Sequence, residues 1–254
     1  MEFGSQRRVS KSAAIYIPIG VLLVVAFTLL GISSFLSIMD IEVEGAAGYT
    51  ADEIIYASGI SVGDNLLFLD TEAAERRITA AIPFVREATI SRMLPDKLLI
   101  EVYESTPIAW IEISDDEIIV IDITARVLQT IDFIPYGLLE VRGVSPAEAI
   151  EGRQLRAEIG GDMQLQHMRD ILTAFEREGM ARDVYYLDMT HVSQISFGYM
   201  GRFRVLLGDP SNLRQKLNAL PEAIVTIDER SGEDVRGVID LTDPTGRVRF
   251  DPRA

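Results

Sequence analysis

The chain has 254 residues and a formal net charge of −15, from 24 Lys and Arg against 39 Asp and Glu. Arg7, Arg8 and Lys11 against Glu2 give the first fourteen residues +2, which leaves −17 for the remainder, and a surface so acidic disfavours a nucleic-acid partner. The absence of cysteine excludes disulfides, thiolate catalysis and cysteine metal sites.

A long apolar segment lies near the N-terminus. Residues 13–35 include no charged residue, and at about 1.5 Å per residue a helix of that length crosses a hydrocarbon core of roughly 30 Å. The basic residues of the tail precede the segment, whereas Asp40 and Glu42 follow it. We therefore predict a single transmembrane helix, with residues 1–12 cytoplasmic and the rest extracytoplasmic at the cell membrane. A cleaved signal peptide is the alternative, but its apolar region is only about 7 to 15 residues long.

The residues after this segment predict a small domain over 36–105. A strand is expected at 38–44, where apolar and acidic residues alternate. Thr50 and Glu53 have the spacing of a capping box, in which each side chain accepts a hydrogen bond from the backbone of the other residue. Gly59 is expected to end the helix that this box begins.

A second helix and a hairpin complete this domain. Asp70 is expected to cap the helix and Pro83 to stop it, with a small apolar stripe on one face. The stripe consists of Ala74, Ile78 and Ala81. A strand over 85–93 then meets the turn Pro95-Asp96, and a second strand follows in which Leu98, Ile100 and Val102 share one face. The predicted order is β-α-α-β-β.

Residues 106–254 predict a second, strand-rich domain of mixed α/β type, which makes the fold class α+β. Strands are expected at 110–113, 117–122, 127–131, 184–189, 194–197, 203–207, 238–242 and 247–250. Pro and Gly residues predict loops and a short element over 133–154. One helix is expected from Asp162 to near Gly179, buried through Leu165, Met168, Leu172 and Phe175. Another is expected after Asp209 as its cap, with Pro210 at the first helical position.

The inventory of reactive side chains favours a binding protein over an enzyme. His167 and His191 lack the clustered spacing of a metal site. The charged turn Asp115-Asp116-Glu117 is typical of a solvated surface rather than of an acid-base pair. Ser193 and Ser196 lack the glycine context of a nucleophile elbow, and Lys216 lies inside a predicted helix rather than before one. We therefore predict no catalytic residue, no metal and no cofactor.

Three segments resemble one family. The first combines the N-terminal anchor with the hairpin SRMLPDKLLIEVYESTPIAW, including Arg92, Pro95, Asp96, Glu104, Pro107, Ala109 and Trp110. The second, VLLGDPSNLRQKLNAL, matches through Gly208, Leu213, Lys216 and Leu217, and the third, GVIDLTDPTGRVRF, through Asp240 and Leu241. Together they resemble the FtsQ/DivIB family of bacterial cell-division proteins, whose first extracytoplasmic module is a POTRA domain (polypeptide-transport-associated domain).

The resemblance implies a non-enzymatic scaffold of the divisome at the division septum. Its expected partners are FtsB and FtsL, or DivIC and FtsL, together with other divisome membrane proteins, and through them it would influence septal peptidoglycan synthesis. The family commonly has a glycine where this chain has Ala125. A left-handed backbone conformation is less favourable for alanine than for glycine by on the order of 1 kcal/mol. This loop is therefore expected to take another form.

The two C-terminal strands are the predicted partner-binding site, because terminal strands often lie at a sheet edge and an exposed edge accepts a partner strand. The residues expected there are Ile239, Leu241, Thr242, Gly246, Val248 and Phe250. The segment 242–246 lacks the Arg-Tyr pair that some family members carry after Asp-Leu, and a proline cannot donate a ladder hydrogen bond. The competing interpretation of these strands is an ordinary solvent-facing hairpin.

Two other functions are alternatives. A POTRA-containing secretion or membrane-protein assembly factor would bind client strands through residues 38–104 alone. An extracellular hydrolase would lose its activity on loss of one carboxylate. A membrane β-barrel or repeated modules would favour the assembly factor, and the residues of this chain fit neither.

Overall fold

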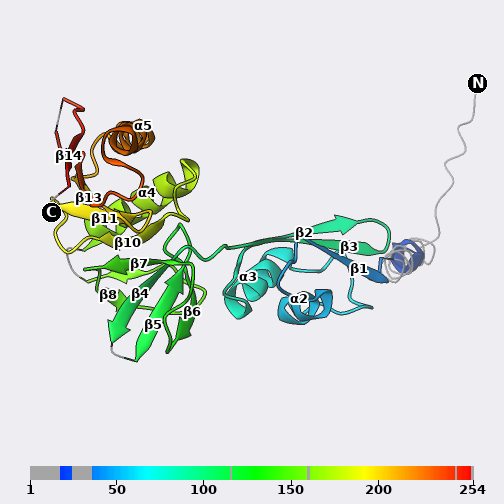
Figure 1. Cartoon of the computed structure of the whole chain (residues 1–254). Helices are drawn as coiled ribbons and strands as arrows, with labels where there is room; N and C mark the ends of the chain where they lie inside the picture. Colours follow the sequence, from blue (N-terminus) through cyan, green and yellow to red (C-terminus); the bar gives the residue numbers. More distant parts are fainter. Residues whose placement is uncertain (1–17, 25–35, 115, 159–160, 244, 253–254) are drawn as a thin grey trace, which may run out of the picture. The chain divides into compact units, whose positions relative to one another are not determined.

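The computed structural model describes residues 18–24, 36–114, 116–158, 161–243 and 245–252, which form two compact units after the short helical stretch 18–24 (Figure 1). The first unit comprises the chain up to Ile78 and the later segment Glu87–Tyr103. The second unit comprises the intervening segment Thr79–Arg86 and the chain from Glu104 onward. Most of the predicted membrane helix 13–35 lies outside the described residues. In the described part, no helix combines the length and the hydropathy needed to cross a bilayer.

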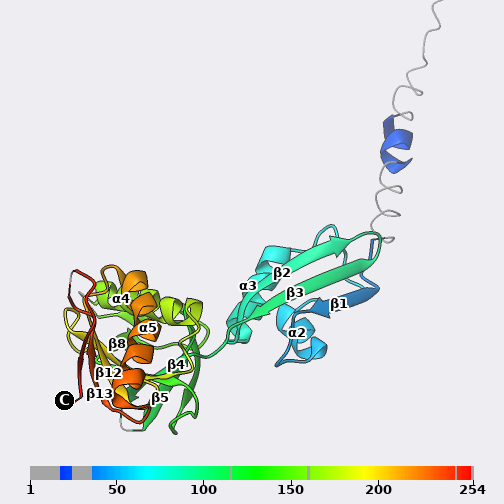
Figure 2. The same cartoon turned by 45° about the horizontal axis from the view of Figure 1, so that its top comes forward.

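The first unit is a three-stranded sheet with two helices. Its elements are β1 (Asp40–Glu44), α2 (Ala51–Ser58), α3 (Thr71–Ala81), β2 (Val85–Met93) and β3 (Lys97–Glu104). The strand order is β1-β3-β2, with β1 parallel to β3 and the β2–β3 turn at the same end as the start of β1 (Figure 2). The predicted β-α-α-β-β order is confirmed.

Local signals in the sequence define the two helices of this unit. Thr50 and Glu53 form the predicted capping box, in which the Glu53 carboxylate accepts from the Thr50 backbone at 2.8 Å. These hydrogen bonds from Thr50 lower the pKa of Glu53. Gly59 ends α2 with a left-handed φ of 67°, and Asp70 accepts from the backbone of Ala73 at 3.0 Å. Both helix starts are therefore fixed by their own side chains.

The second unit is built on a nine-stranded sheet in the order β14-β13-β12-β11-β10-β7-β4-β5-β6. The strands are β4 (Ala109–Ser114), β5 (Glu117–Ile121), β6 (Val127–Ile131), β7 (Leu139–Arg142), β10 (Val184–Asp188), β11 (Ile195–Tyr199), β12 (Phe203–Gly208), β13 (Gly237–Asp240) and β14 (Arg249–Asp251). A separate two-stranded ladder pairs β8 (Pro146–Glu148) with β9 (Arg156–Ala157). The helices are α4 (Asp162–Arg177) and α5 (Leu213–Ser231).

Both helices pack on the sheet through one hydrophobic core. The predicted α4 stripe, from Leu165 to Phe175, is buried, and the Phe175 ring lies 4.9 Å from the ring of Phe197 on β11. Helix α5 contributes Leu217, Leu220, Ile224 and Ile227 to the same cluster. Strand β12 contributes alternate residues, Phe203, Val205 and Leu207, to this core, whereas β11 is buried at every position.

The short element predicted within 133–154 is the strand β7, which joins the two halves of the sheet as a parallel neighbour of both β10 and β4. Three other predicted details of the second unit are wrong: the cap at Asp209, the helix start at Pro210 and the form of the loop at Ala125. Asp209 does not cap α5, which begins three residues after Pro210, behind the left-handed Asn212. Asp209 instead closes a turn by accepting from the backbone of Ser211 at 2.8 Å.

The third correction concerns Ala125, which keeps a left-handed backbone with φ 61°. The buried carboxylate of Asp122 supports this loop by accepting from the backbone N–H groups of Thr124 at 2.8 Å and Arg126 at 3.0 Å. Ser105 donates to the other oxygen of Asp122 at 2.7 Å. These charge-assisted bonds offset the strain of a left-handed alanine.

Candidate partner-binding site

Strand β14 lies at one end of the nine-stranded sheet. It pairs antiparallel with β13, with Ile239 opposite Phe250, and β13 in turn pairs parallel with β12. The observed strands are shorter than predicted, since β13 ends at Asp240 and β14 begins at Arg249. The chain terminus thus supplies an edge strand, the geometry that strand addition requires.

The predicted site residues divide into core and surface. Ile239 and Leu241 are buried in the main core, so their side chains are not available to a partner. Val248 and Phe250 are half-buried, and the Phe250 ring lies 6.1 Å from Phe203 in an edge-to-face arrangement. Thr242 and Gly246 are exposed in the loop.

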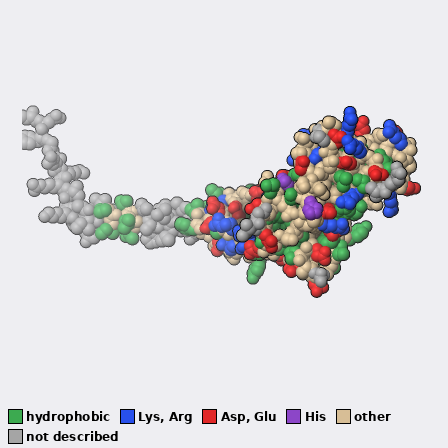
Figure 3. Space-filling model, turned by 90° about the vertical axis from the view of Figure 1, so that its left-hand side faces the viewer, with side chains coloured by type: hydrophobic (Ala, Val, Ile, Leu, Met, Phe, Trp, Pro, Cys, Tyr) green, Lys and Arg blue, Asp and Glu red, His purple; other side chains and the backbone are tan. Residues whose placement is uncertain are grey.

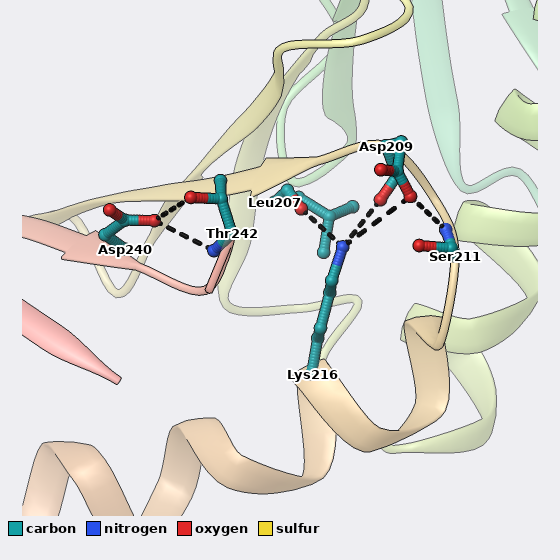
Figure 4. A network of polar contacts seen from close by, with 6 residues as sticks. All are labelled: Leu207, Asp209, Ser211, Lys216, Asp240 and Thr242. Atoms are coloured by element: carbon teal, nitrogen blue, oxygen red, sulfur yellow. Dashed lines mark hydrogen bonds and ion pairs between the residues drawn. The ribbon is translucent and has the colours of Figure 1, made fainter. Parts of the chain in front are cut away.

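Two aspartates order the loop between β13 and β14. Asp240 accepts from the backbone of Thr242 at 2.8 Å and from its hydroxyl at 2.7 Å (Figure 4). Asp243 accepts from the backbone and the hydroxyl of Thr245 at 2.8 and 2.6 Å, and Arg249 donates to its other oxygen at 3.0 Å. The hydrogen bonds from Thr245, aided by the nearby arginines, lower the pKa of Asp243. These hydrogen bonds join the described residues on either side of position 244 to one another and to β14.

Lys216 fixes helix α5 beside this edge. Its ammonium group donates to the carbonyl of Leu207 at 2.9 Å and to that of Asp209 at 2.7 Å, at the point where β12 leaves the sheet (Figure 4). At the other end of the helix, Arg202 forms a two-pronged ion pair with Asp228, at 2.7 and 2.8 Å. This pairing raises the pKa of Arg202 and lowers that of Asp228. Both ends of α5 are thereby fixed to the sheet.

Grooves run between α5 and the β13–β14 hairpin. Their lining includes Gln215, Ala219, Ala223, Gly246, Arg247, Val248 and Phe250. The helical residues and Arg247 were not among the predicted site residues. The spacing of Ala219 and Ala223 at i and i+4 was the available signal, because small residues on one helix face leave room for another chain. The grooves adjoin the edge strand, so one partner segment can contact both.

The opposite edge of the sheet, β6, is covered by the chain itself. The backbone of Val127 donates to Arg153 and accepts from Gly152, both at 2.8 Å. The backbone N–H of Thr130 donates to the carboxylate of Glu151 at 2.7 Å. Residues 151–155 therefore occupy ladder positions that a partner strand would need. The β14 edge is the better candidate for strand addition.

Within the residues that the structure describes, no three His, Asp or Glu side chains gather in a way that could hold a metal ion. His167 lies on α4 and His191 in the turn before β11. Lys216 and Ser196 are engaged in structural hydrogen bonds, to backbone carbonyls and to Arg204 at 3.5 Å. What this part of the molecule offers chemically is a strand edge with an adjacent groove.

Comparison with known proteins agrees with this architecture. Residues 36–105 match the model of the POTRA domain, FtsQ-type. Cell division protein DivIB of Clostridium tetani is 23% identical over 185 residues, which cover 72% of this chain and 68% of that protein. Cell division protein FtsQ of Corynebacterium glutamicum is 33% identical over 132 residues, covering 51% of this chain and 58% of that protein. FtsQ of Streptomyces venezuelae is 29% identical over 130 residues, covering 50% of this chain and 48% of that protein.

The fold and the match over residues 36–105 first define a class: a protein with an FtsQ-type POTRA domain followed by a strand-rich unit with an available edge. The relatives then narrow this class to one family, because they carry the names FtsQ and DivIB. The longest of these matches covers 185 residues and so extends far beyond the POTRA segment. The family model and these relatives together support the FtsQ/DivIB family for this chain.

Proposed function

We propose that this protein is a divisome scaffold that binds other division proteins outside the membrane and links septum assembly to septal peptidoglycan synthesis. The observation that carries the proposal is the asymmetry of the nine-stranded sheet, in which residues 151–155 cover the β6 edge while β14 ends the sheet beside a groove. A scaffold needs such a binding edge and needs no catalytic group.

The proposed partner is an FtsB- or FtsL-like protein, or its DivIC counterpart. A short strand of that partner pairs with β14 through main-chain hydrogen bonds, and its alternate side chains enter the groove beside α5. Arg247 and Arg249 are exposed at this edge, so acidic residues on the partner strand would increase the association rate. Ile239 and Leu241 act from the core, by holding β13 in place.

The proposed topology is single-pass, with residues 1–12 cytoplasmic, residues 13–35 spanning the membrane, residues 36–105 forming the POTRA domain and residues 106–254 forming the partner-binding domain. The sequence supports this through the uncharged apolar run and the basic residues before it. The protein would then act at the division septum, on the outer side of the cell membrane.

Site-specific photocrosslinking in dividing cells tests the proposal. A photoreactive benzoylphenylalanine replaces Arg247 beside the β14 edge in one variant and Thr130 at the β6 edge in the control. We expect a crosslink to an FtsB-, DivIC- or FtsL-like protein from position 247 and none from position 130. Equal crosslinking from both positions, or crosslinks from 247 to nascent secreted or outer-membrane clients alone, would contradict the scaffold.

A fluorescent fusion of the full chain separates division from secretion. The proposal predicts bands at midcell in dividing cells, because a divisome scaffold is recruited to the septum. Uniform peripheral fluorescence would instead support the membrane-assembly alternative.

A further inference from the structure

Large apolar side chains are exposed together at one end of the first unit. They are Met39, Val62, Leu67, Phe68, Met93 and Leu94, and we call them the apolar tip. Phe68 is 80% exposed, Met39 72% and Leu94 66%. Hydrophobic side chains are visible at the surface in the space-filling view (Figure 3). Exposed apolar groups gathered in one place indicate a contact surface rather than ordinary scatter.

Backbone hydrogen bonds bring the tip residues together from three segments. The backbone of Met39 donates to the carbonyl of Asp96 in the β2–β3 turn at 2.8 Å. The adjacent Ile38 donates to the carbonyl of Asp64 in the α2–α3 loop, also at 2.8 Å. The chain entering β1 therefore lies between that turn and that loop. The exposed apolar side chains of these three segments consequently lie at the same end of the unit.

A hydrogen-bonded turn in the α2–α3 loop orients two of its apolar residues toward the surface. Leu66 is fully buried and fastens the loop to the core. Asn65 then accepts from the backbone of Leu67 at 2.9 Å through its side chain and from that of Phe68 at 3.2 Å through its carbonyl. This turn directs Leu67 and Phe68 to the surface, so their exposure does not arise from an unfolded loop.

The position of the tip along the chain identifies its occupant. Leu36 directly follows the uncharged segment 13–35, and four residues of extended chain reach at most about 14 Å. If residues 13–35 span the bilayer, Met39 and its neighbours lie at the level of the lipid headgroups. We propose that the apolar tip inserts into the outer interface of the membrane, about 5 to 10 Å deep as interfacial apolar side chains do. This inference rests on the proposed membrane anchor.

Charge at the tip favours an apolar over an electrostatic mode of binding. Lys97 lies between Asp40 at 2.9 Å and Glu42 at 2.8 Å, and the hydrogen bonds that it donates to the carboxylates of Glu42 and Asp40 raise its pKa. Its charge is therefore balanced within the protein. Insertion should consequently not require anionic lipid, unlike the binding of a basic patch.

Single-cysteine labelling of the full chain tests this proposal, since the chain has no cysteine of its own. The variants Phe68→Cys and Leu94→Cys carry an environment-sensitive fluorophore at the tip. Tyr103→Cys is the matched control, because it is half-exposed on the same unit but about 20 Å along β3 from Lys97. Each is reconstituted in phosphatidylcholine vesicles, with and without phosphatidylglycerol, and with a spin-labelled lipid as quencher.

We expect blue-shifted emission at positions 68 and 94 and lipid quenching at least about twofold stronger than at 103, with or without phosphatidylglycerol. Equal, water-like emission at all three positions in vesicles that float with the protein would overturn the tip and leave the anchor standing. Blue-shifted emission that the lipid label does not quench would also overturn it, because a protein surface would then cover the tip. Protein that fails to float with the vesicles would overturn both the anchor and the tip.

Discussion

The two edges of the nine-stranded sheet differ in what covers them. At β6, residues 151–155 provide backbone and carboxylate partners for Val127 and Thr130, so the chain completes its own ladder. At β14, the sheet order ends with a three-residue strand beside a groove. One edge is closed within the fold, and the other is the edge that we propose binds a second chain.

This difference shows how one sheet can combine stability with binding. Natural proteins protect edge strands because an open edge recruits other chains indiscriminately. Here the exposed strand is short and bears Arg249 and Asp251, features that restrict pairing to a partner with matching charges. Mutations at the β6 edge should therefore change stability, and mutations at the β14 edge should change binding.

The largest expected effect is at the closed edge. Arg126, which begins the turn into β6, donates to the carbonyls of Thr79 at 2.8 Å, Pro83 at 3.0 Å and Val85 at 3.2 Å. Arg126→Ala leaves these carbonyls without their donor and should lower the free energy of unfolding by about 2 to 3 kcal/mol in urea titration. The exposed Arg153→Ala is the control, expected within about 0.5 kcal/mol of the parent. Equal stability of both variants would contradict this role.

The second prediction concerns the open edge. Phe250→Ala removes a half-buried ring that packs on Phe203. We expect the free energy of unfolding to fall by about 2 kcal/mol, roughly half the cost at a fully buried site. Capture of the FtsB- or DivIC-like partner should also decrease. The exposed Phe133, just beyond β6, provides the control Phe133→Ala, which should preserve both. Undiminished capture by folded Phe250→Ala would place the binding site elsewhere.

The third prediction uses pH to release the loop beside β14. The pKa of Asp243 lies below its ordinary value of 3.8. A carboxylate of this kind stabilises the fold above the unfolded pKa, and its contribution is lost as pH falls through the folded pKa. The amide resonance of Thr245 should therefore stay constant from pH 8 to 5 and shift only below about pH 4. Asp243→Asn should abolish that titration, and a shift between pH 5 and 7 would contradict the assignment.

The smallest expected effect is at Ala125. Glycine relieves a left-handed backbone by about 1 kcal/mol, but Ala125→Gly also removes a fully buried methyl group that contributes about 0.8 kcal/mol. The two changes nearly cancel, so thermal unfolding should show a difference of less than about 0.5 kcal/mol. A larger gain in stability would show that Asp122 does not offset the strain.

Much of the fold was predictable because local chemistry specifies it. The capping box of Thr50, the cap at Asp70 and the apolar stripe of α4 each act within a few residues, and the structure has all three. The short element predicted within 133–154 was not identified as a strand, because only Leu139 and Val141 carry the pattern of β7, between Gly137 and Gly143. Its strand character comes from parallel neighbours distant in sequence, which override local turn signals.

The start of α5 was missed for a related reason. Asp209-Pro210 has the local signature of a helix start. The Lys216 side chain donates hydrogen bonds to the carbonyls of Leu207 and Asp209 instead, and the helix begins only at Leu213. At the candidate site, the terminal position of β14 was predictable from chain order. The burial of Ile239 and Leu241 and the contribution of Ala219 depend on how α5 packs, which no local pattern contains.

The most direct test of the account is hydrogen–deuterium exchange of the full chain with and without its FtsB- or DivIC-like partner. The account predicts that the partner slows exchange in β14 and the adjoining loop by about tenfold or more, and leaves β6 unchanged, because its amides are already paired within the fold. Protection of β6, or no change in β14 while the complex forms, would contradict it.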